Sequence, residues 1–231
     1  MDTLINYLSQ FTTPRRFELF KKVAANRTKY ITPVLEDIYQ PQNASAVLRT
    51  CDCLGIQDIH IIEQRNRYKL NPDVELGSAQ WLNLFRYNQP EGNTSSAIQS
   101  LKSKGYRIVA TTPHTNDVTL DELDLSKGKI ALLFGTELKG LTQEALDLSD
   151  EFVRIPMTGF TESFNISVSA AIFLYTLMKE LRDSSIPWKL SEDEQNDLIL
   201  DWLRKSIKLS DQLEKRFIFD NQNQEPWRSN Q

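Results

Sequence analysis

Polar side chains follow a predicted strand in the segment from residue 152 to residue 174. The apolar run at 152–157 leads into a turn rich in Gly, Thr and Ser, which carries Ser163 and Asn165, and then into a helix pattern of small residues. Hydroxyl and amide groups between a strand and a helix can bind a small polar ligand. The segment therefore predicts a ligand pocket at the end of a strand.

A second segment, from Leu133 to Thr142, joins an apolar strand pattern to two glycines. It differs from a phosphate-binding P-loop because Leu141 stands where that loop needs Lys, and because the carboxylate of Glu137 would repel a polyphosphate. Glycines beside a carboxylate suit a ligand that is held by backbone hydrogen bonds and carries little negative charge. S-adenosylmethionine, with its sulfonium cation, meets that description.

A third segment lies early in the chain, where Asn43 can cap a helix that runs to Leu54. In this order and at these distances, residues 43–50, 133–142 and 152–174 resemble the three motifs of the SpoU branch of ribose 2′-O-methyltransferases, most closely the TrmH group that acts on tRNA. The resemblance runs from about Arg16 to Leu181. It implies a SPOUT-type fold with a deep trefoil knot, an obligate homodimer, and S-adenosylmethionine-dependent 2′-O-methylation of a D-loop guanosine of the position 18 type.

The resemblance also implies the site residues. Catalysis is expected from Arg49, Asn43, Glu137, Ser163 and Asn165. Cofactor contacts, largely through the backbone, are expected from Thr111, Gly135, Gly140, Leu141, Ile155 and Phe164. Phe164 departs from the family pattern, which more often has Leu at this place, so the shape of the adenine pocket is in question.

The role of Arg49 has two interpretations. Some accounts of the family make it the general base, but a guanidinium resists deprotonation. The alternative is a bidentate clamp on a substrate phosphate, with phosphate or water taking the proton of the hydroxyl. Asn43 and Asn165 also have an alternative as helix caps, and Glu137 could simply accept hydrogen bonds from backbone amides.

The elements that must position these residues alternate along the chain. Apolar runs predict strands at 34–39, 56–63, 108–111, 130–134 and 152–157, and helix patterns lie at 43–54, 93–104, 142–148 and 165–180. This alternation predicts an α/β fold with a mainly parallel sheet and helices on both faces. The polar, basic segment 65–71 is expected to be a surface loop of the kind that often holds substrate.

Helical extensions are expected at both ends of this catalytic region. The predicted division is an N-terminal RNA-binding extension at 1–30, a methyltransferase domain at 31–183, and a C-terminal extension with a tail at 184–231. Ser191 and Glu194 form a capping-box pattern that starts the C-terminal helix.

The net charge of −4 means that an RNA partner needs a local basic patch. Residues 14–29 form the most basic window, and its only acid is Glu18. A solvated helix face is one interpretation of such a run. In the TrmH group, however, such extensions hold tRNA, which implies RNA contacts from Arg15, Arg16, Lys21, Lys22 and Arg27.

Composition excludes several classes of protein. The sequence has no apolar stretch long enough to cross a membrane and no signal-peptide pattern at its start, so a cytoplasmic protein is expected. Cys51 and Cys53 are expected to be reduced packing residues, and His60 and His114 to be structural. No metal site is expected.

Two alternatives to the tRNA methyltransferase remain open. One is a ribose 2′-O-methyltransferase that acts on ribosomal RNA or on another tRNA position, although such relatives often carry a separate N-terminal RNA-binding domain. The other is a non-catalytic RNA-binding or assembly protein on the same scaffold. Arg49, Asn43, Ser163 and Asn165 argue against the second alternative.

Overall fold

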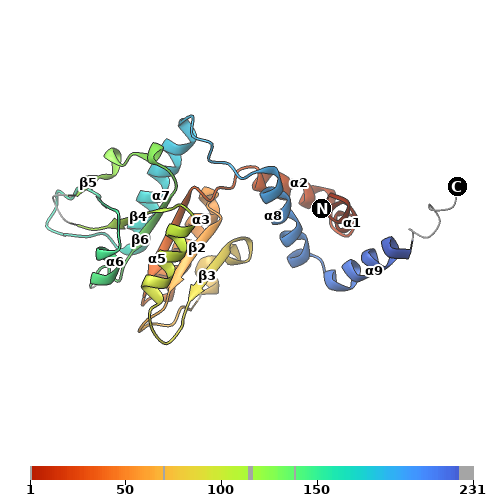
Figure 1. Cartoon of the computed structure of the whole chain (residues 1–231), viewed down its shortest axis with the longest axis horizontal. Helices are drawn as coiled ribbons and strands as arrows, with labels where there is room; N and C mark the ends of the chain where they lie inside the picture. Colours follow the sequence, from red (N-terminus) through yellow and green to blue (C-terminus); the bar gives the residue numbers. More distant parts are fainter. Residues whose placement is uncertain (1, 70, 114–116, 138, 224–231) are drawn as a thin grey trace. The chain divides into compact units, whose positions relative to one another are not determined.

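The computed structural model describes residues 2–69, 71–113, 117–137 and 139–223. It divides into two compact units, Thr28–Trp188 and a second unit that combines Met1–Arg27 with Lys189–Gln231 (Figure 1). The sequence predicted separate extensions at the two ends, and their clustering into one unit is a feature that local patterns did not reveal. His114 and most of the predicted tail lie outside the described residues.

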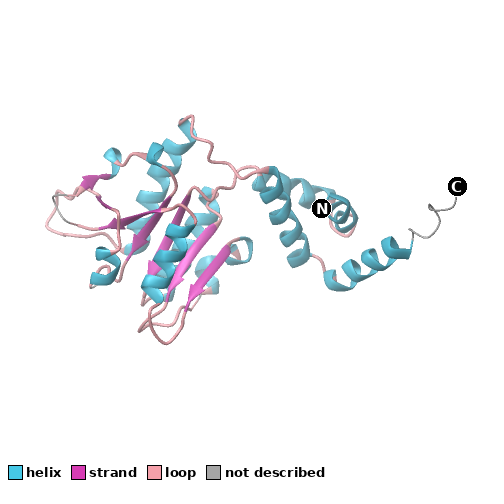
Figure 2. Cartoon of the chain, in the orientation of Figure 1, coloured by secondary structure: helices cyan, strands magenta, loops and turns pink. Residues whose placement is uncertain are grey.

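The larger unit is built on a seven-stranded sheet with the order β3-β2-β1-β6-β4-β7-β5. Each pairing between these strands is parallel, so the predicted parallel α/β fold is confirmed (Figure 2). The strands are β1 (Ile31–Glu36), β2 (Asp58–Ile62), β3 (Asn83–Tyr87), β4 (Arg107–Thr111), β5 (Val118–Thr119), β6 (Ile130–Phe134) and β7 (Glu151–Arg154).

Helices cover both faces of this sheet. They are α3 (Pro41–Leu54), α4 (Pro72–Glu75), α5 (Asn93–Ser103), α6 (Gln143–Asp147) and α7 (Ile166–Asp183). Because side chains alternate along a strand, Leu132 of β6 packs with residues of α3 and α7, whereas Leu133 packs with residues of α5 and α6. The central strands β1, β2 and β6 are therefore buried on both faces, as their continuous apolar runs predict.

Parallel strands place all of their carboxyl ends at one edge of the sheet. The loops that follow β1, β2, β4, β6 and β7 thus begin at the same edge. In open sheets of this kind the ligand binds at that edge.

The observed elements differ from the expected ones in two instructive places. The helix expected to begin at Asn43 begins at Pro41 with Gln40 as its N-cap, so Asn43 does not cap it. Strand β3 was missed because it lies at the end of the sheet and is only partly buried. Its pattern therefore lacks the continuous apolar run of the central strands.

The smaller unit is helical. It contains α1 (Asp2–Ser9), α2 (Pro14–Ala24), α8 (Glu192–Ser206) and α9 (Ser210–Asn223). The expected capping box of Ser191 and Glu194 begins α8. Trp202 is 1% exposed and packs against Phe20, with ring centroids 5.8 Å apart. The N-terminal and C-terminal segments thus share one small core.

Candidate functional site

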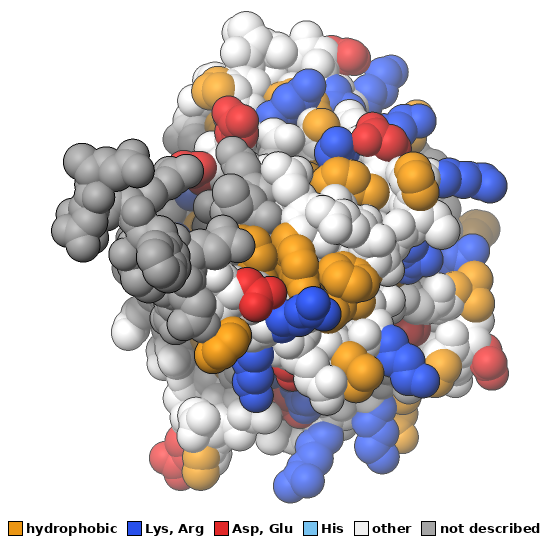
Figure 3. Space-filling view, turned by 90° about the vertical axis from the view of Figure 1, so that its right-hand side faces the viewer, with side chains coloured by type: hydrophobic (Ala, Val, Ile, Leu, Met, Phe, Trp, Pro, Cys, Tyr) orange, Lys and Arg blue, Asp and Glu red, His pale blue; other side chains and the backbone are white. Residues whose placement is uncertain are grey.

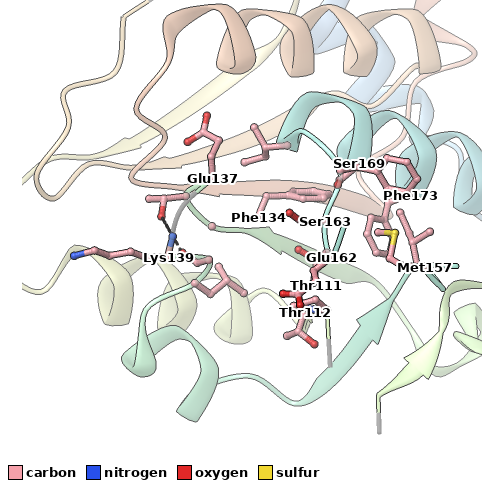
Figure 4. Close-up of a pocket in the computed structure, with 18 of the residues that line it drawn as sticks. Thr111, Thr112, Phe134, Glu137, Lys139, Met157, Glu162, Ser163, Ser169 and Phe173 are labelled. Atoms are coloured by element: carbon pink, nitrogen blue, oxygen red, sulfur yellow. Dashed lines mark hydrogen bonds between the residues drawn. The ribbon is translucent and has the colours of Figure 1, made fainter. Parts of the chain in front are cut away.

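A cleft of about 370 Å³ opens at the carboxyl edge of the sheet (Figure 4). Three loops line it, at 111–113 after β4, 135–141 after β6 and 155–164 after β7. Phe134, Phe173 and Met157 give the cleft apolar walls. Among the residues labelled in Figure 4, Glu137 and Lys139 lie on the opposite side of the cleft from Met157. The volume is in the range of small-molecule sites.

The six residues expected to contact a cofactor all line this cleft. They are Thr111, Gly135, Gly140, Leu141, Ile155 and Phe164. The hydroxyl of Thr111 donates to the carbonyl of Leu133 at 2.7 Å, so this side chain fastens β4 to β6. Phe164 is 42% exposed, which leaves a large aromatic surface at the opening.

The two glycines of the loop after β6 meet different steric demands. A Cβ atom on Gly135 would lie 2.1 Å from the backbone carbon of Gly140, so residue 135 cannot carry a side chain without moving the loop. Gly140 has open space around it, but its φ of +67° is a conformation that favours glycine. Backbone hydrogen bonds of 2.9 Å in both directions between Thr136 and Gly140 close the turn.

A buried carboxylate that the sequence analysis missed holds this loop in place. Glu36, at the end of β1, is 1% exposed. Its Oε2 accepts the backbone N–H of Thr142 at 2.8 Å, and its Oε1 accepts the hydroxyls of Thr142 and Thr94 at 2.7 Å each. The sequence signal is that Glu36 is the one charged residue of β1. Glu36 therefore ties β1 and α5 to the end of the glycine loop.

Three of the expected catalytic residues meet beside the cleft, each from a different motif. Nδ2 of Asn43 donates to Oε1 of Glu137 at 2.5 Å, and Nδ2 of Asn165 donates to Oδ1 of Asn43 at 3.1 Å. Asn165 also caps α7, since its Oδ1 accepts the N–H of Ser167 at 2.9 Å. Asn165 thus serves as a cap and as part of this cluster at once.

The other two expected catalytic residues lie in different places. Ser163 lines the cleft. Arg49 is exposed on α3, where the described residues place it in a separate shallow depression with Val74 and Tyr175. Asn43 and Arg49 are six residues apart, so their side chains leave the helix in directions about 120° apart. Within the part of the chain that the structure describes, Arg49 therefore does not reach the cleft of the same chain.

The sequence analysis also missed polar residues of the cleft wall. Glu162, Thr112, Lys139 and Ser169 line the cleft along with the expected residues. Glu162 stands next to Ser163 in the sequence, and this position beside an expected site residue could have identified it as a residue of the cleft. With Glu137, it adds a second carboxylate to the cleft, which favours a ligand with positive charge over a polyphosphate.

The expected RNA-binding residues of the helical unit fall into two groups. Arg15, Arg16, Lys21 and Lys22 are exposed on α2. Arg27, in contrast, is 1% exposed, and its guanidinium lies 5.5 Å from the ring centroid of Trp202. The expectation that Arg27 binds a phosphate is therefore corrected, because burial in the helical core removes it from solvent. Lys and Arg side chains are spread over the face drawn in Figure 3.

The described residues offer neither a membrane span nor a metal centre. Within the described ranges no helix is both long and apolar enough to cross a bilayer. The same ranges contain no group of three or more His, Cys, Asp or Glu side chains that could hold a metal ion.

Comparison with known proteins agrees with these motifs. The SpoU rRNA Methylase family matches residues 31–175. A tRNA (guanosine(18)-2′-O)-methyltransferase of Borreliella burgdorferi is 48% identical over 204 residues, which cover 88% of this chain and 91% of that protein.

Solved structures share the fold. A TrmH/SpoU tRNA modifying enzyme of A. aeolicus matches with a TM-score of 0.74 and 27% identity, over 84% of this chain and 98% of its own. The SpoU methyltransferase AviRb of Streptomyces viridochromogenes, solved in complex with AdoMet, has a TM-score of 0.59 and 23% identity, over 71% of this chain and 62% of its own. The expected resemblance is confirmed, and the chain belongs to the SpoU rRNA Methylase family.

Proposed function

We propose that this protein transfers a methyl group from S-adenosylmethionine to the ribose 2′-oxygen of a guanosine in the tRNA D-loop. One structural observation carries the proposal: Asn43 is hydrogen-bonded to both Glu137 and Asn165 beside the cleft. The 48% identity to a tRNA (guanosine(18)-2′-O)-methyltransferase over most of both chains supports tRNA as the substrate and position 18 as the target.

The cleft fits the proposed cofactor. Apolar walls from Phe134, Phe173 and Met157 suit an adenine ring, and the loop around Gly135 offers backbone groups close to the cleft. Glu137 and Glu162 are compatible with a sulfonium cation and unfavourable for a polyphosphate. When bound there, S-adenosylmethionine supplies the electrophilic methyl group.

The protein's own groups have two tasks in this reaction. They must align the 2′-oxygen with the methyl group, and they must leave a route for the hydroxyl proton. We assign Ser163 and the Asn43–Glu137–Asn165 cluster to orientation, since they lie in or beside the cleft. Arg49 is proposed as a bidentate clamp on a phosphate next to the reacting ribose.

The position of Arg49 favours a homodimer. The depression around Arg49 is formed by α3, α4 and α7, and it includes Ile172 and Tyr175, of which Tyr175 is 62% exposed. Val168, on the same helix α7, is 45% exposed. We propose that a second copy covers this face and that Arg49 acts at the cleft of the partner subunit.

The helical unit is proposed to hold tRNA through Arg15, Arg16, Lys21 and Lys22. These four side chains are exposed on one short helix, and a local cluster of this kind is what a protein of net charge −4 needs for a polyanion. We further propose the deep trefoil knot that the family implies and, from the tRNA substrate, a cytoplasmic location. An experimental structure traced through residues 107–183 tests the knot.

The test is transfer of labelled methyl from S-adenosylmethionine to unmodified tRNA, followed by mapping of the modified nucleoside. We expect a 2′-O-methylated guanosine at position 18 and its loss in Arg49→Ala. Transfer to ribosomal RNA alone would keep the chemistry and change the substrate. No transfer to any RNA by a folded protein would favour a non-catalytic RNA-binding protein.

A further inference from the structure

A basic loop follows β2 at residues 64–71, and the cleft does not involve it. Its sequence, QRNRYKLN, contains Arg65, Arg67 and Lys69 and no acidic residue. All three cationic side chains are exposed. Among the described residues, no carboxylate forms an ion pair with any of them, whereas the nearby Arg86 is paired with Glu63 at 2.7 Å. The loop therefore presents three positive charges to solvent.

The start of this loop is fixed by one carboxylate oxygen. Oδ1 of Asp37 accepts the backbone N–H groups of Gln64, Arg65 and Asn66 at 3.1, 2.8 and 2.8 Å. Asp37 is 7% exposed and has a φ of +55°, an uncommon conformation for a residue with a side chain. Asn66 adds a bond from Nδ2 to the carbonyl of Asp37 at 2.9 Å. The backbone at 64–66 is thus turned inward.

The remainder of the loop has three more anchors. Oε2 of the buried Glu63 accepts the N–H of Tyr68 at 3.0 Å, and the hydroxyl of Ser45 on α3 accepts the N–H of Asn71 at 2.8 Å. The Tyr68 side chain is half-buried and packs against the hydrophobic core. With backbone and Tyr68 directed inward, the neighbouring side chains of Arg67 and Lys69 remain outside.

The loop lies on the same edge of the sheet as the cleft. It follows the carboxyl end of β2, which is two places from β6 in the strand order, a separation of about 10 Å. Ser45, which holds the end of the loop, is on the same helix as Asn43 and Arg49. Val74, just after the loop, lines the depression that contains Arg49. The loop therefore begins at the edge of the sheet that carries the cleft and ends beside the depression that contains Arg49, so an RNA bound at either place lies near it.

We infer that Arg65, Arg67 and Lys69 form a second RNA-binding site, which holds backbone phosphates of the substrate close to the reacting nucleotide. The inference rests on the proposed function. The chemistry is that of phosphate recognition by exposed cations, and the prior fixing of the loop lowers the entropy lost on binding. The site is separate from the basic helix α2, so it supplies RNA contacts on the unit that carries the cleft.

The test uses the full-length variant Arg65→Gln/Arg67→Gln/Lys69→Gln and unmodified tRNA, with binding measured over a series of salt concentrations. We expect the Kd at low salt to rise about tenfold or more, and the slope of log Kd on log salt to fall by about 2, because each lost phosphate contact removes roughly 0.7–0.9 from it. The affinity for S-adenosylmethionine and the thermal unfolding temperature are expected to stay at wild-type values.

A control removes three positive charges elsewhere on the same unit. Unlike the loop cations, two of these are ion-paired, Lys102 with Asp150 at 2.7 Å and Lys127 with Glu151 at 3.7 Å. Lys102 and Lys104 lie at the end of α5, just before the amino end of β4, and Lys127 precedes β6, so all three are near the opposite edge of the sheet. Lys102→Gln/Lys104→Gln/Lys127→Gln is expected to keep wild-type tRNA affinity and salt slope. An equal loss of tRNA affinity in both triple variants would show a general effect of charge and would contradict the proposed RNA-binding site.

Two further results separate this inference from the proposed function. If wild-type protein methylates tRNA while the loop variant matches it in Kd and salt slope, the loop is not an RNA contact and only this inference fails. If wild-type protein neither binds nor methylates tRNA, the proposed function fails and the inference fails with it. In Asp37→Asn, which keeps the three cations, the salt slope is expected to persist while the Kd rises.

Discussion

The side-chain amide of Asn43 donates a hydrogen bond of 2.5 Å to Oε1 of Glu137, although 94 positions of sequence separate the two residues. Asn165 joins this pair through the carbonyl oxygen of the Asn43 amide at 3.1 Å. Asn43 therefore links the motif after β1, the motif after β6 and the motif after β7. Its amide is suited to this position because it can donate to a carboxylate and accept from a second amide at once.

Replacement of Asn43 tests this link. Asn43→Ala leaves Glu137 and Asn165 without the bridge, and we expect methyl transfer to fall by about a hundredfold because orientation is lost. Asn43→Asp keeps the size but places a second carboxylate beside Glu137, so a larger loss is expected. Single-turnover rates with saturating cofactor measure both effects. Equal activity of Asn43→Asp and wild type would contradict the role of the amide donor.

Glu36 is predicted to control the cofactor loop from outside the cleft. Glu36→Gln exchanges an acceptor for a donor that faces the N–H and hydroxyl of Thr142, so the S-adenosylmethionine Kd should rise and stability should fall by about 1–3 kcal/mol. Thr94→Val removes one of the hydrogen bonds to Glu36, together with the one that Thr94 accepts from Gln64, and leaves both bonds between Glu36 and Thr142, so a smaller effect on cofactor binding is expected. Calorimetric binding and chemical denaturation measure the two quantities, and an unchanged Kd in Glu36→Gln would argue against this positioning.

The two loop glycines should respond differently to the same substitution. In Gly135→Ala the new Cβ would lie 2.1 Å from backbone at Gly140, so the loop must move and cofactor binding should be lost. In Gly140→Ala no atom lies within 4 Å of the new Cβ, and only the left-handed φ opposes the change, at a cost of about 1 kcal/mol. Titration of both variants with S-adenosylmethionine measures which substitution weakens cofactor binding more. A milder effect at Gly135 than at Gly140 would refute the steric argument.

His60 is predicted to make stability depend on acidity. Its pKa is lowered from 6.5 to about 4, mainly because burial disfavours the charged ring and also because Lys104 repels it. Between these two values the unfolded chain binds a proton that the folded chain does not, so the free energy of unfolding falls as the pH falls, by roughly 3 kcal/mol at most.

The measurement is chemical denaturation at several pH values from 7 to about 4. The lowered pKa of His60 sets this pH window. His60→Gln removes the titrating group, together with the stacking on Phe85 at 4.7 Å. The variant is therefore expected to be less stable at pH 7 but to lose less stability on acidification. An identical pH slope in both proteins would show that other groups cause it.

Substitutions of Arg16 and Arg27 are expected to have different effects, one on RNA binding and the other on the packing of the helical unit. Arg16 is exposed, although its guanidinium lies 5.5 Å from the ring centroid of Phe20, so Arg16→Ala should weaken tRNA binding and flatten its salt dependence with a smaller loss of stability than Arg27→Ala. Arg27 is buried against Trp202, so Arg27→Ala should lower the unfolding free energy by roughly 2–4 kcal/mol. Denaturation and tRNA titration of the two variants decide this. A stable Arg27→Ala with weakened tRNA binding would restore the original expectation for this residue.

Much of the fold could be predicted because its causes are local. Apolar runs with fixed periods predicted the central strands, and Thr142, Asn165 and Ser191 were read correctly as starts of helices. The half-exposed strand β3 gave no such signal. The motifs also identified the loops around the cleft, since the carboxyl ends of parallel strands must share one edge.

The sequence by itself thus determined which segments form the central strands of the sheet and which loops approach one another. Only the tertiary structure decided the direction of individual side chains: Arg49 away from the cleft, Arg27 into the helical core, and Glu36 onto Thr142. The physical reason is the distance along the chain over which each effect acts. Periodicity and capping depend on neighbours within a few positions, whereas these three placements depend on helix phase and on partners far away in the chain.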